Sequence, residues 1–90
     1  MNKNYISGRN VEYKAIKKLR EEGAIIAQRS AGSHSLVDIF ACLPDGSIKL
    51  IQVKTGSSPL HFEKLAALPH AENVSIELWH WKDGKFTIYR

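Results

Sequence analysis

The strongest constraint on the fold is a pair of apolar runs joined by a short turn. Residues 36–43 and residues 48–54 are rich in branched and aromatic side chains, which favour β-strands. The four residues between them read Pro-Asp-Gly-Ser, a combination typical of tight turns. The two runs are therefore predicted to form a β-hairpin.

The other segments predict an α/β protein. After a loosely held start over residues 1–6, a helix is expected over residues 8–22, with Ser7 as its N-cap and Gly23 as its stop signal. Further strands are expected over 24–28, 74–81 and 86–89, and a short helix over 60–68. The order α-β-β-β-α-β-β predicts a mixed sheet of about five strands flanked by helices. The chain of 90 residues forms one domain, 1–90, on this interpretation.

Charge and cysteine content narrow the class of protein. Lys and Arg number 13 against 9 for Asp and Glu, and the net charge of +4 gives mild support to a polyanionic partner. The single cysteine, Cys42, excludes an internal disulfide and favours a cytoplasmic protein. Apolar runs fall far short of the roughly 20 residues that a membrane span needs, so no membrane partner is expected.

Polar residues stand where these strands are expected to be buried. Asp38 interrupts the first run of the hairpin, and Gln52 and Lys54 share one side of the second. Aspartate also occurs at strand ends and bulges, and Gln-x-Lys is common on exposed faces. The combination favours a site, because charges in a buried strand destabilise the fold unless they are paired or bind metal.

Glu12 adds a third polar position. At about 100° per residue, it lies within the apolar stripe of the first helix, which is formed by Val11, Ala15, Ile16 and Leu19. One interpretation is a boundary glutamate that pairs with a lysine or arginine. With Asp38 downstream, an inward-facing functional carboxylate is favoured.

These residue types suit phosphodiester hydrolysis. Oxygen ligands from Asp38, Gln52 and the backbone carbonyl of Val53 are those that Mg²⁺ or Mn²⁺ prefers. Such an ion lowers the pKa of a bound water and neutralises charge on a phosphate. In this scheme Lys54 orients the water or stabilises the developing oxyanion, and Glu12 binds a second ion or holds the water network of the first.

The same residues resemble a known family. The stretch from Arg29 to Ala41, which begins Arg-Ser-Ala-Gly-Ser, and residues 51–54, Ile-Gln-Val-Lys, resemble the core of archaeal-type Holliday junction resolvases. These enzymes belong to the PD-(D/E)xK nuclease superfamily. Residues 8–12, on a helix that ends in Glu22 and Gly23, match the opening helix of the family. The resemblance covers about residues 7–56 and implies a restriction-endonuclease-like core.

The resemblance implies a Mg²⁺-dependent endonuclease of DNA recombination and repair. It would act as a homodimer and nick two strands of a four-way DNA junction symmetrically. The catalytic residues would be Glu12, Asp38, Gln52 and Lys54. DNA contacts would come from Arg9 on the helix and from loop residues Arg29, Ser30, Ser33 and His34. Either Ser30 or Ser33 would assist catalysis.

Two departures from the family keep other functions open. Most relatives carry Glu at the position of Gln52, although Mrr-like restriction enzymes carry Gln-x-Lys. Only 36 residues follow Lys54, so the region that relatives use for pairing and junction contact is shorter here. The alternative function is a non-catalytic or weakly active DNA-binding module that retains the nuclease fold. A structural or interaction domain is a third possibility.

The remaining polar and aromatic residues have simpler interpretations. The four histidines lack the spacing of a zinc site. Trp79 and Trp81 share a strand face, which favours a core or dimer interface over stacking on bases. The three lysines of the first helix form a solvated face: Lys14, Lys17 and Lys18.

Overall fold

The computed structural model describes residues 3–30, 37–56 and 62–90. These described residues form one long helix, one short helix and five strands. In order these are α1 (Lys3–Glu21), β1 (Ile26–Arg29), β2 (Ile39–Cys42), β3 (Ile48–Thr55), α2 (Phe62–Ala66), β4 (Val74–Lys82) and β5 (Lys85–Tyr89). The element order and the mixed α/β class are as the sequence predicts.

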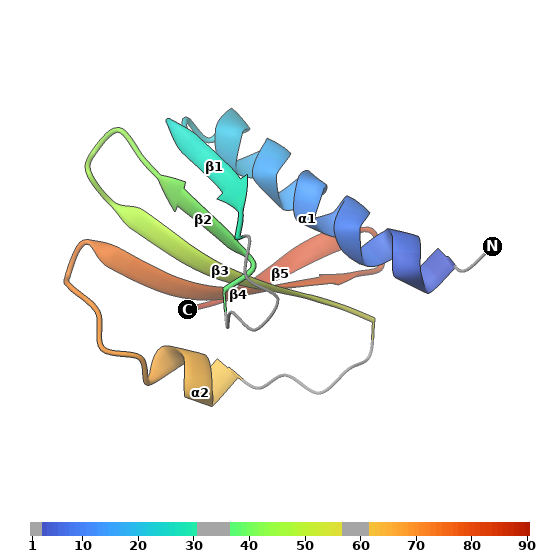
Figure 1. The fold of residues 1–90 in the computed structure, drawn as a ribbon. Helices are drawn as coiled ribbons and strands as arrows, with labels where there is room; N and C mark the ends of the chain where they lie inside the picture. The colour runs from blue at the N-terminus through green and yellow to red at the C-terminus, as the bar shows by residue number, and fades with distance from the viewer. Residues whose placement is uncertain (1–2, 31–36, 57–61) are drawn as a thin grey trace.

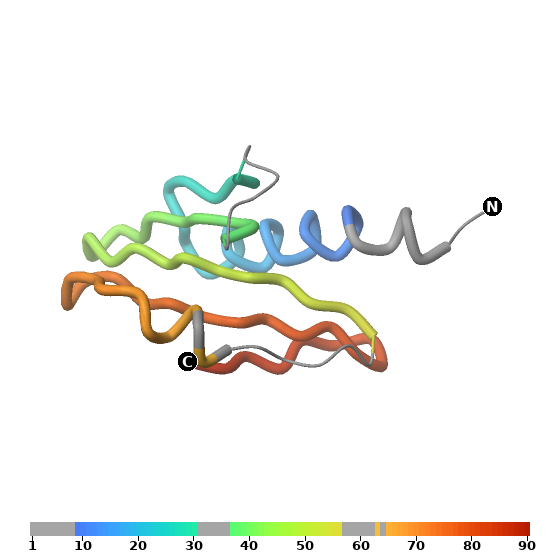
Figure 2. Tube along the Cα trace, turned by 60° about the horizontal axis from the view of Figure 1, so that its bottom comes forward, coloured from blue at the N-terminus to red at the C-terminus, as the bar shows by residue number. Residues whose placement is uncertain are grey.

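The strands form one open sheet in the order β1-β2-β3-β4-β5. Neighbouring strands are antiparallel except β3 and β4, which are parallel and are connected through α2. The twisted sheet and the diagonal path of α1 are visible in Figure 1. In the turned view of Figure 2 the strands follow one another from β1 at the top to β5 at the bottom.

The core lies between α1 and one face of the sheet. Ala15, Ile16 and Leu19 of the helix pack against buried residues of four strands, namely Ala27, Ile39, Ala41, Ile51 and Trp79. This burial explains the apolar stripe on the helix. On the other face, Leu65 of α2 is buried, as are Ile76 and Leu78 of β4. No helix in the described ranges is long and apolar enough to cross a membrane.

The glycine and turn signals of the sequence are confirmed. Gly23 has a φ of 103°, and beyond it the amide of Ala24 donates to the carbonyl of Leu19, which closes the helix end. In the hairpin turn, the carboxylate of Asp45 accepts hydrogen bonds from the backbone and the hydroxyl of Ser47. These local interactions fix the β2–β3 hairpin.

Several predicted boundaries were wrong. The helix begins at Lys3, so Ser7 lies within α1 and is not its N-cap. Of the residues predicted as a strand over 36–43, Ile39–Cys42 form β2 and residue 36 lies outside the described ranges; β1 lies further along the chain than predicted and ends at Arg29. Tertiary pairing with a short partner strand, which sequence propensity does not encode, limits both elements.

Candidate functional site at the open end of the hairpin

Asp38 lies immediately before β2, at the end of the hairpin opposite its turn. Its amide donates to the carbonyl of Ile51 on β3 at 2.9 Å, and its carbonyl accepts from the amide of Ser30 at 2.7 Å. Asp38 is therefore at a strand end and not inside the strand, which corrects the prediction. Backbone bonds on both sides hold it between the end of β1 and β3.

The carboxylate of Asp38 turns back toward β3. Its Oδ2 accepts a hydrogen bond from the amide of Val53 at 2.8 Å. The amide and carbonyl of one strand residue point to the same side of the strand, so the carbonyl of Val53 faces the Asp38 side as well. One carboxylate and one carbonyl oxygen thus converge at this end of the sheet.

Burial raises the pKa of the Asp38 carboxyl above its usual value of 3.8. The hydrogen bond from Val53 opposes this rise in pKa, the negative charge of Glu12 adds to it, and the positive charges of Lys54 and Arg29 oppose it. Three other predicted site residues, Glu12, Arg29 and Lys54, therefore lie within electrostatic range of Asp38. The four residues come from three strands or strand ends and from α1, at positions 12, 29, 38 and 54.

Glu12 pairs with Arg29 across α1 and β1. The Nε of Arg29 donates to Oε1 of Glu12 at 2.7 Å, with the side chains 37% and 21% exposed respectively. The hydrogen bond and charge of Glu12 raise the pKa of Arg29, which needs no such help to stay protonated. Glu12 thus pairs with an arginine, as expected of a boundary glutamate, and it also lies near Asp38, as expected of an inward-facing carboxylate. Arg29 is the last residue of β1, not a loop residue.

Gln52 and Lys54 lie on β3, both half-buried. Lys54 pairs in the parallel ladder with His80 of β4, whose Nε2 lies 2.5 Å from the carbonyl oxygen of Gly56. This contact anchors the chain just beyond Lys54. It was not predicted, because the β3–β4 register depends on the crossover through α2.

Two further residues, Arg9 and Tyr13, lie near the Glu12–Arg29 pair. Arg9 is exposed on α1, one turn before the Glu12–Arg29 pair. Tyr13, which the sequence did not single out, has its ring centroid 5.6 Å from the guanidinium carbon of Arg29. Ser33 and His34 lie outside the described residues.

The donor set fits a hard cation only in part. Oδ2 of Asp38 and Oε1 of Glu12 have protein partners, and within the described part of the chain Oδ1 and Oε2 have none. Within residues 3–30, 37–56 and 62–90, no three side chains of His, Cys, Asp or Glu are arranged to hold a metal. A Mg²⁺ ion here would therefore need the amide oxygen of Gln52 and the carbonyl of Val53 beside the two carboxylates.

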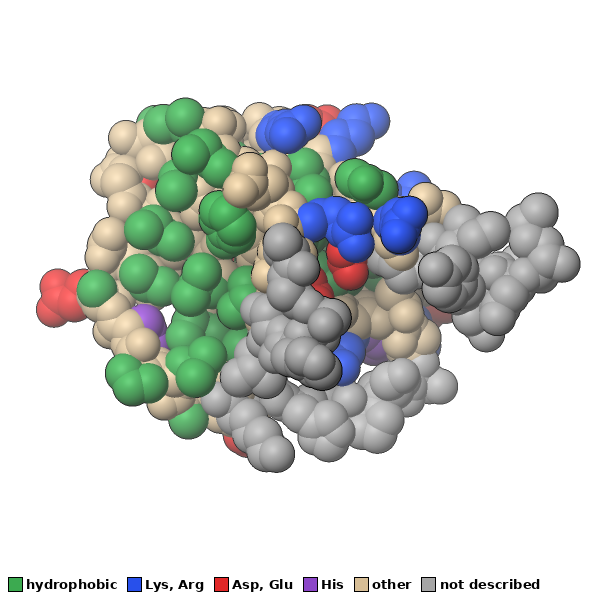
Figure 3. All heavy atoms as spheres, viewed as in Figure 1, with side chains coloured by type: hydrophobic (Ala, Val, Ile, Leu, Met, Phe, Trp, Pro, Cys, Tyr) green, Lys and Arg blue, Asp and Glu red, His purple; other side chains and the backbone are tan. Residues whose placement is uncertain are grey.

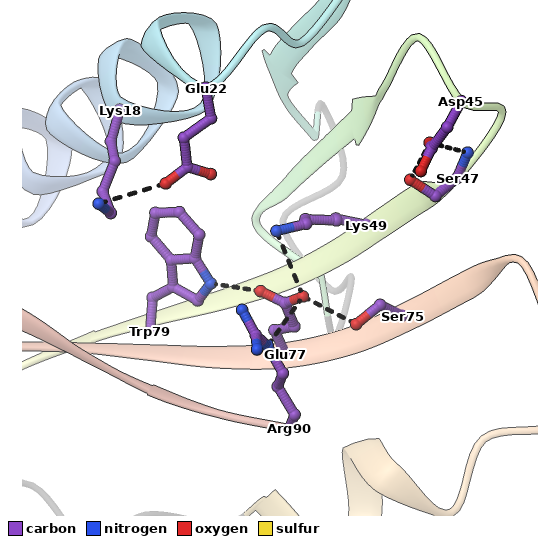
Figure 4. Close-up of polar contacts among 9 residues, drawn as sticks. All are labelled: Lys18, Glu22, Asp45, Ser47, Lys49, Ser75, Glu77, Trp79 and Arg90. Atoms are coloured by element: carbon purple, nitrogen blue, oxygen red, sulfur yellow. Dashed lines mark hydrogen bonds and ion pairs between the residues drawn. The ribbon is translucent and has the colours of Figure 1, made fainter.

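A second buried carboxylate, Glu77 on β4, is fully paired. It is 1% exposed, and its oxygens accept hydrogen bonds from the indole of Trp79 and the hydroxyl of Ser75. Lys49 and Arg90 lie 3.7 Å and 3.5 Å from Oε2 (Figure 4). Strand alternation places Glu77 and Trp79 on the same face of β4, but it does not indicate that the Glu77 carboxylate is buried. Because Trp79 is 0% exposed, it cannot stack on bases.

Comparison of the chain with protein-family models, with curated proteins and with solved structures finds no match in any of the three.

Proposed function

We propose that the protein is a metal-dependent DNA endonuclease that hydrolyses phosphodiester bonds. One observation carries the proposal: the half-buried carboxylate of Asp38 lies at a strand end among the charges of Glu12, Arg29 and Lys54. A carboxylate with a raised pKa that has cationic neighbours and one bonded oxygen is typical of a functional site. The oxygen donors and the lysine suit phosphoryl chemistry in particular.

The proposal assigns each residue a role. Asp38, Gln52 and the carbonyl of Val53 would hold a Mg²⁺ or Mn²⁺ ion, which supplies an activated water and charge neutralisation when bound. Lys54 would orient that water or stabilise the charge that develops on the scissile phosphate. Glu12 would complete the shell through Oε2, and Arg29 would both orient Glu12 and contact the phosphate.

The preferred substrate proposed here is branched DNA, above all the four-way junction. This part of the proposal depends on the sequence resemblance over about residues 7–56. Symmetric nicking of a junction requires two active sites, so the proposal includes a homodimer. The net charge of +4 is compatible with a polyanionic substrate.

The test is cleavage of labelled four-way junction and of linear duplex, with Mg²⁺, with Mn²⁺ and with chelator. We expect metal-dependent cleavage of the junction and a loss of at least about 100-fold in Asp38→Asn, because a metal ligand is removed. Asp45→Asn is the matched control, since Asp45 caps the turn at the other end of the hairpin. Cleavage that persists in Asp38→Asn would contradict the assignment of Asp38 to the active site.

Gln52→Glu tests the one unusual ligand. The substitution adds a negative charge while it keeps an oxygen donor, so metal affinity should rise and cleavage should equal or exceed that of the natural chain. Complete loss of cleavage would contradict the ligand role of Gln52. Titration with Mn²⁺ measures the affinity directly.

A DNA-binding module without efficient cleavage is the second candidate. It is favoured by the 2.7 Å ion pair, which uses one oxygen of Glu12, and by the neutral side chain at position 52. Junction binding that depends on salt, with no cleavage in Mg²⁺ or Mn²⁺, would select this candidate.

A further inference from the structure

The basic side chains on the two flanks of α1 differ in their contacts. On one flank the Nζ of Lys14 lies 5.6 Å from the ring centroid of Trp81, and Lys18 pairs with Glu22 at 3.2 Å. On the other flank Arg9 and Lys17 are exposed, and neither has an ion pair or hydrogen bond within the part of the chain that the structure describes. The second flank therefore offers uncompensated positive charge.

Helix geometry separates the two flanks. At about 100° per residue, Arg9, Tyr13 and Lys17 fall within about 80° of one another, whereas Lys18 lies about 100° beyond Lys17. Contacts with β1 are made on this flank by Tyr13 and Arg20. Arg20, on the same flank, donates to the carbonyl of Ala27 at 3.3 Å, and the ring of Tyr13 lies against Arg29. Arg9, Tyr13, Lys17 and Arg29 define what we call the α1–β1 basic edge.

The basic edge adjoins the candidate active site. In Figure 3 basic side chains gather over α1 and the end of β1, directly beside acidic ones. Over residues 9–17 the sequence holds one carboxylate, Glu12, and Arg29 neutralises it. Arg29 belongs to both regions, because it forms part of the edge and also bonds Glu12. An anionic ligand bound along the edge therefore reaches the carboxylates.

We propose that the α1–β1 basic edge binds the backbone of a DNA duplex arm and leads it to Asp38. From Arg9 to Lys17 the helix rises by about 12 Å, and a DNA strand passes roughly three to four phosphates over that length. Tyr13, 53% exposed, lies between Arg9 and Lys17 along the helix and has its ring against Arg29. Phosphate contacts of this kind set the register of a duplex without reading its sequence. The inference rests on the proposed function, which it extends to the path of the substrate.

Lys17 and Lys18 form a matched pair for the test. They are adjacent on one helix and carry the same charge, but Lys17 belongs to the α1–β1 basic edge and Lys18 lies on the other flank of α1. We would measure the dissociation constant of the full chain for a duplex and a four-way junction over a series of salt concentrations, without divalent metal. Thermal midpoints of Lys17→Gln and Lys18→Gln would show that both variants remain folded.

Each phosphate contact contributes about 0.9 to the slope of log affinity against log salt. Lys17→Gln should lower the slope by about 0.9 and weaken binding about fivefold at roughly 0.15 M salt, and Arg9→Gln should do the same. Lys18→Gln should change neither quantity. Equal effects of Lys17→Gln and Lys18→Gln, or no effect of either, would overturn the inference.

The same measurements separate this inference from the nuclease proposal. If the natural chain binds DNA but does not cleave it, the catalytic proposal fails. The salt dependence of DNA binding by the variants then decides by itself whether the α1–β1 basic edge binds DNA. If it cleaves while the two lysine variants behave alike, the edge fails and the catalytic site stands. Absence of any salt-dependent binding by the natural chain overturns both.

Discussion

Two carboxylates of this sheet, Glu77 and Asp38, are both withdrawn from solvent but differ in how they are paired. Glu77 is 1% exposed, and both of its oxygens accept hydrogen bonds, with Lys49 and Arg90 nearby (Figure 4). Asp38 is half-buried and accepts one hydrogen bond, from the amide of Val53. Burial and the charge of Glu12 raise the pKa of Asp38.

The difference separates a structural carboxylate from a candidate functional one. Among the described residues every buried side-chain nitrogen or oxygen has a partner, so the fold satisfies such groups where it can. Glu77 holds β3, β4 and the C-terminal residue together. Among the described residues one oxygen of Asp38 has no hydrogen-bond partner, and burial opposes its charge, which is the condition under which a ligand or metal ion binds favourably.

The largest expected effect comes from removal of Glu77. Glu77→Ala leaves the buried indole N–H of Trp79 and the ammonium group of Lys49 without their acceptor, so stability should fall by about 3–5 kcal/mol. Urea unfolding curves, monitored by tryptophan fluorescence, would measure the loss of stability. Arg90→Gln is the control, because Arg90 is 66% exposed and its pair with Glu77 should contribute at most about 1 kcal/mol. Similar losses in both variants would contradict the structural role assigned to Glu77.

Asp38→Asn should act in the opposite direction. The amide keeps an acceptor for the amide of Val53 and removes the charge that burial destabilises, so stability at pH 7 should rise by on the order of 1 kcal/mol. Mg²⁺ should stabilise the natural chain and not the variant, since a ligand stabilises only the form that binds it. A loss of stability at pH 7 would show that the charge of Asp38 is well compensated.

The pH dependence of this gain follows from the direction of the pKa shift. Because folding raises the pKa of Asp38 above its usual 3.8, the contribution of its carboxyl to stability is greatest below the unfolded pKa. It declines as pH rises through the folded pKa. The advantage of Asp38→Asn should therefore be present at neutral pH and vanish in acid. Unfolding curves at both pH values, with Asp45→Asn as control, test the sign.

The Asp38 region and the Glu77 region differ in how far the sequence predicts them. The hairpin, the apolar stripe of α1 and the inward position of Glu12 follow from local periodicity and turn chemistry, whereas the nearness of Glu12 to Asp38 was expected from the combination of polar residues and the family resemblance. The pairing of Glu12 with Arg29 was not predicted, because β1 was expected to end before Arg29 and the two residues are 17 positions apart. The burial of Glu77 was not predicted either, since it depends on partners from β3 and from the C-terminal residue, Lys49 and Arg90, which local periodicity does not indicate.

Charge-removal variants of Glu12 and Arg29 give the finest test of the Asp38 region. The charge of Glu12 raises the pKa of Asp38 and that of Arg29 lowers it. In Glu12→Gln the pKa of Asp38 should therefore fall, and in Arg29→Gln it should rise. NMR titration of the Asp38 carboxyl carbon would measure both shifts. Lys18→Gln, on the far flank of α1, serves as a control that should leave the pKa unchanged. Shifts of the same sign in both site variants would mean that the ion pair acts on Asp38 through its geometry and not through the two charges.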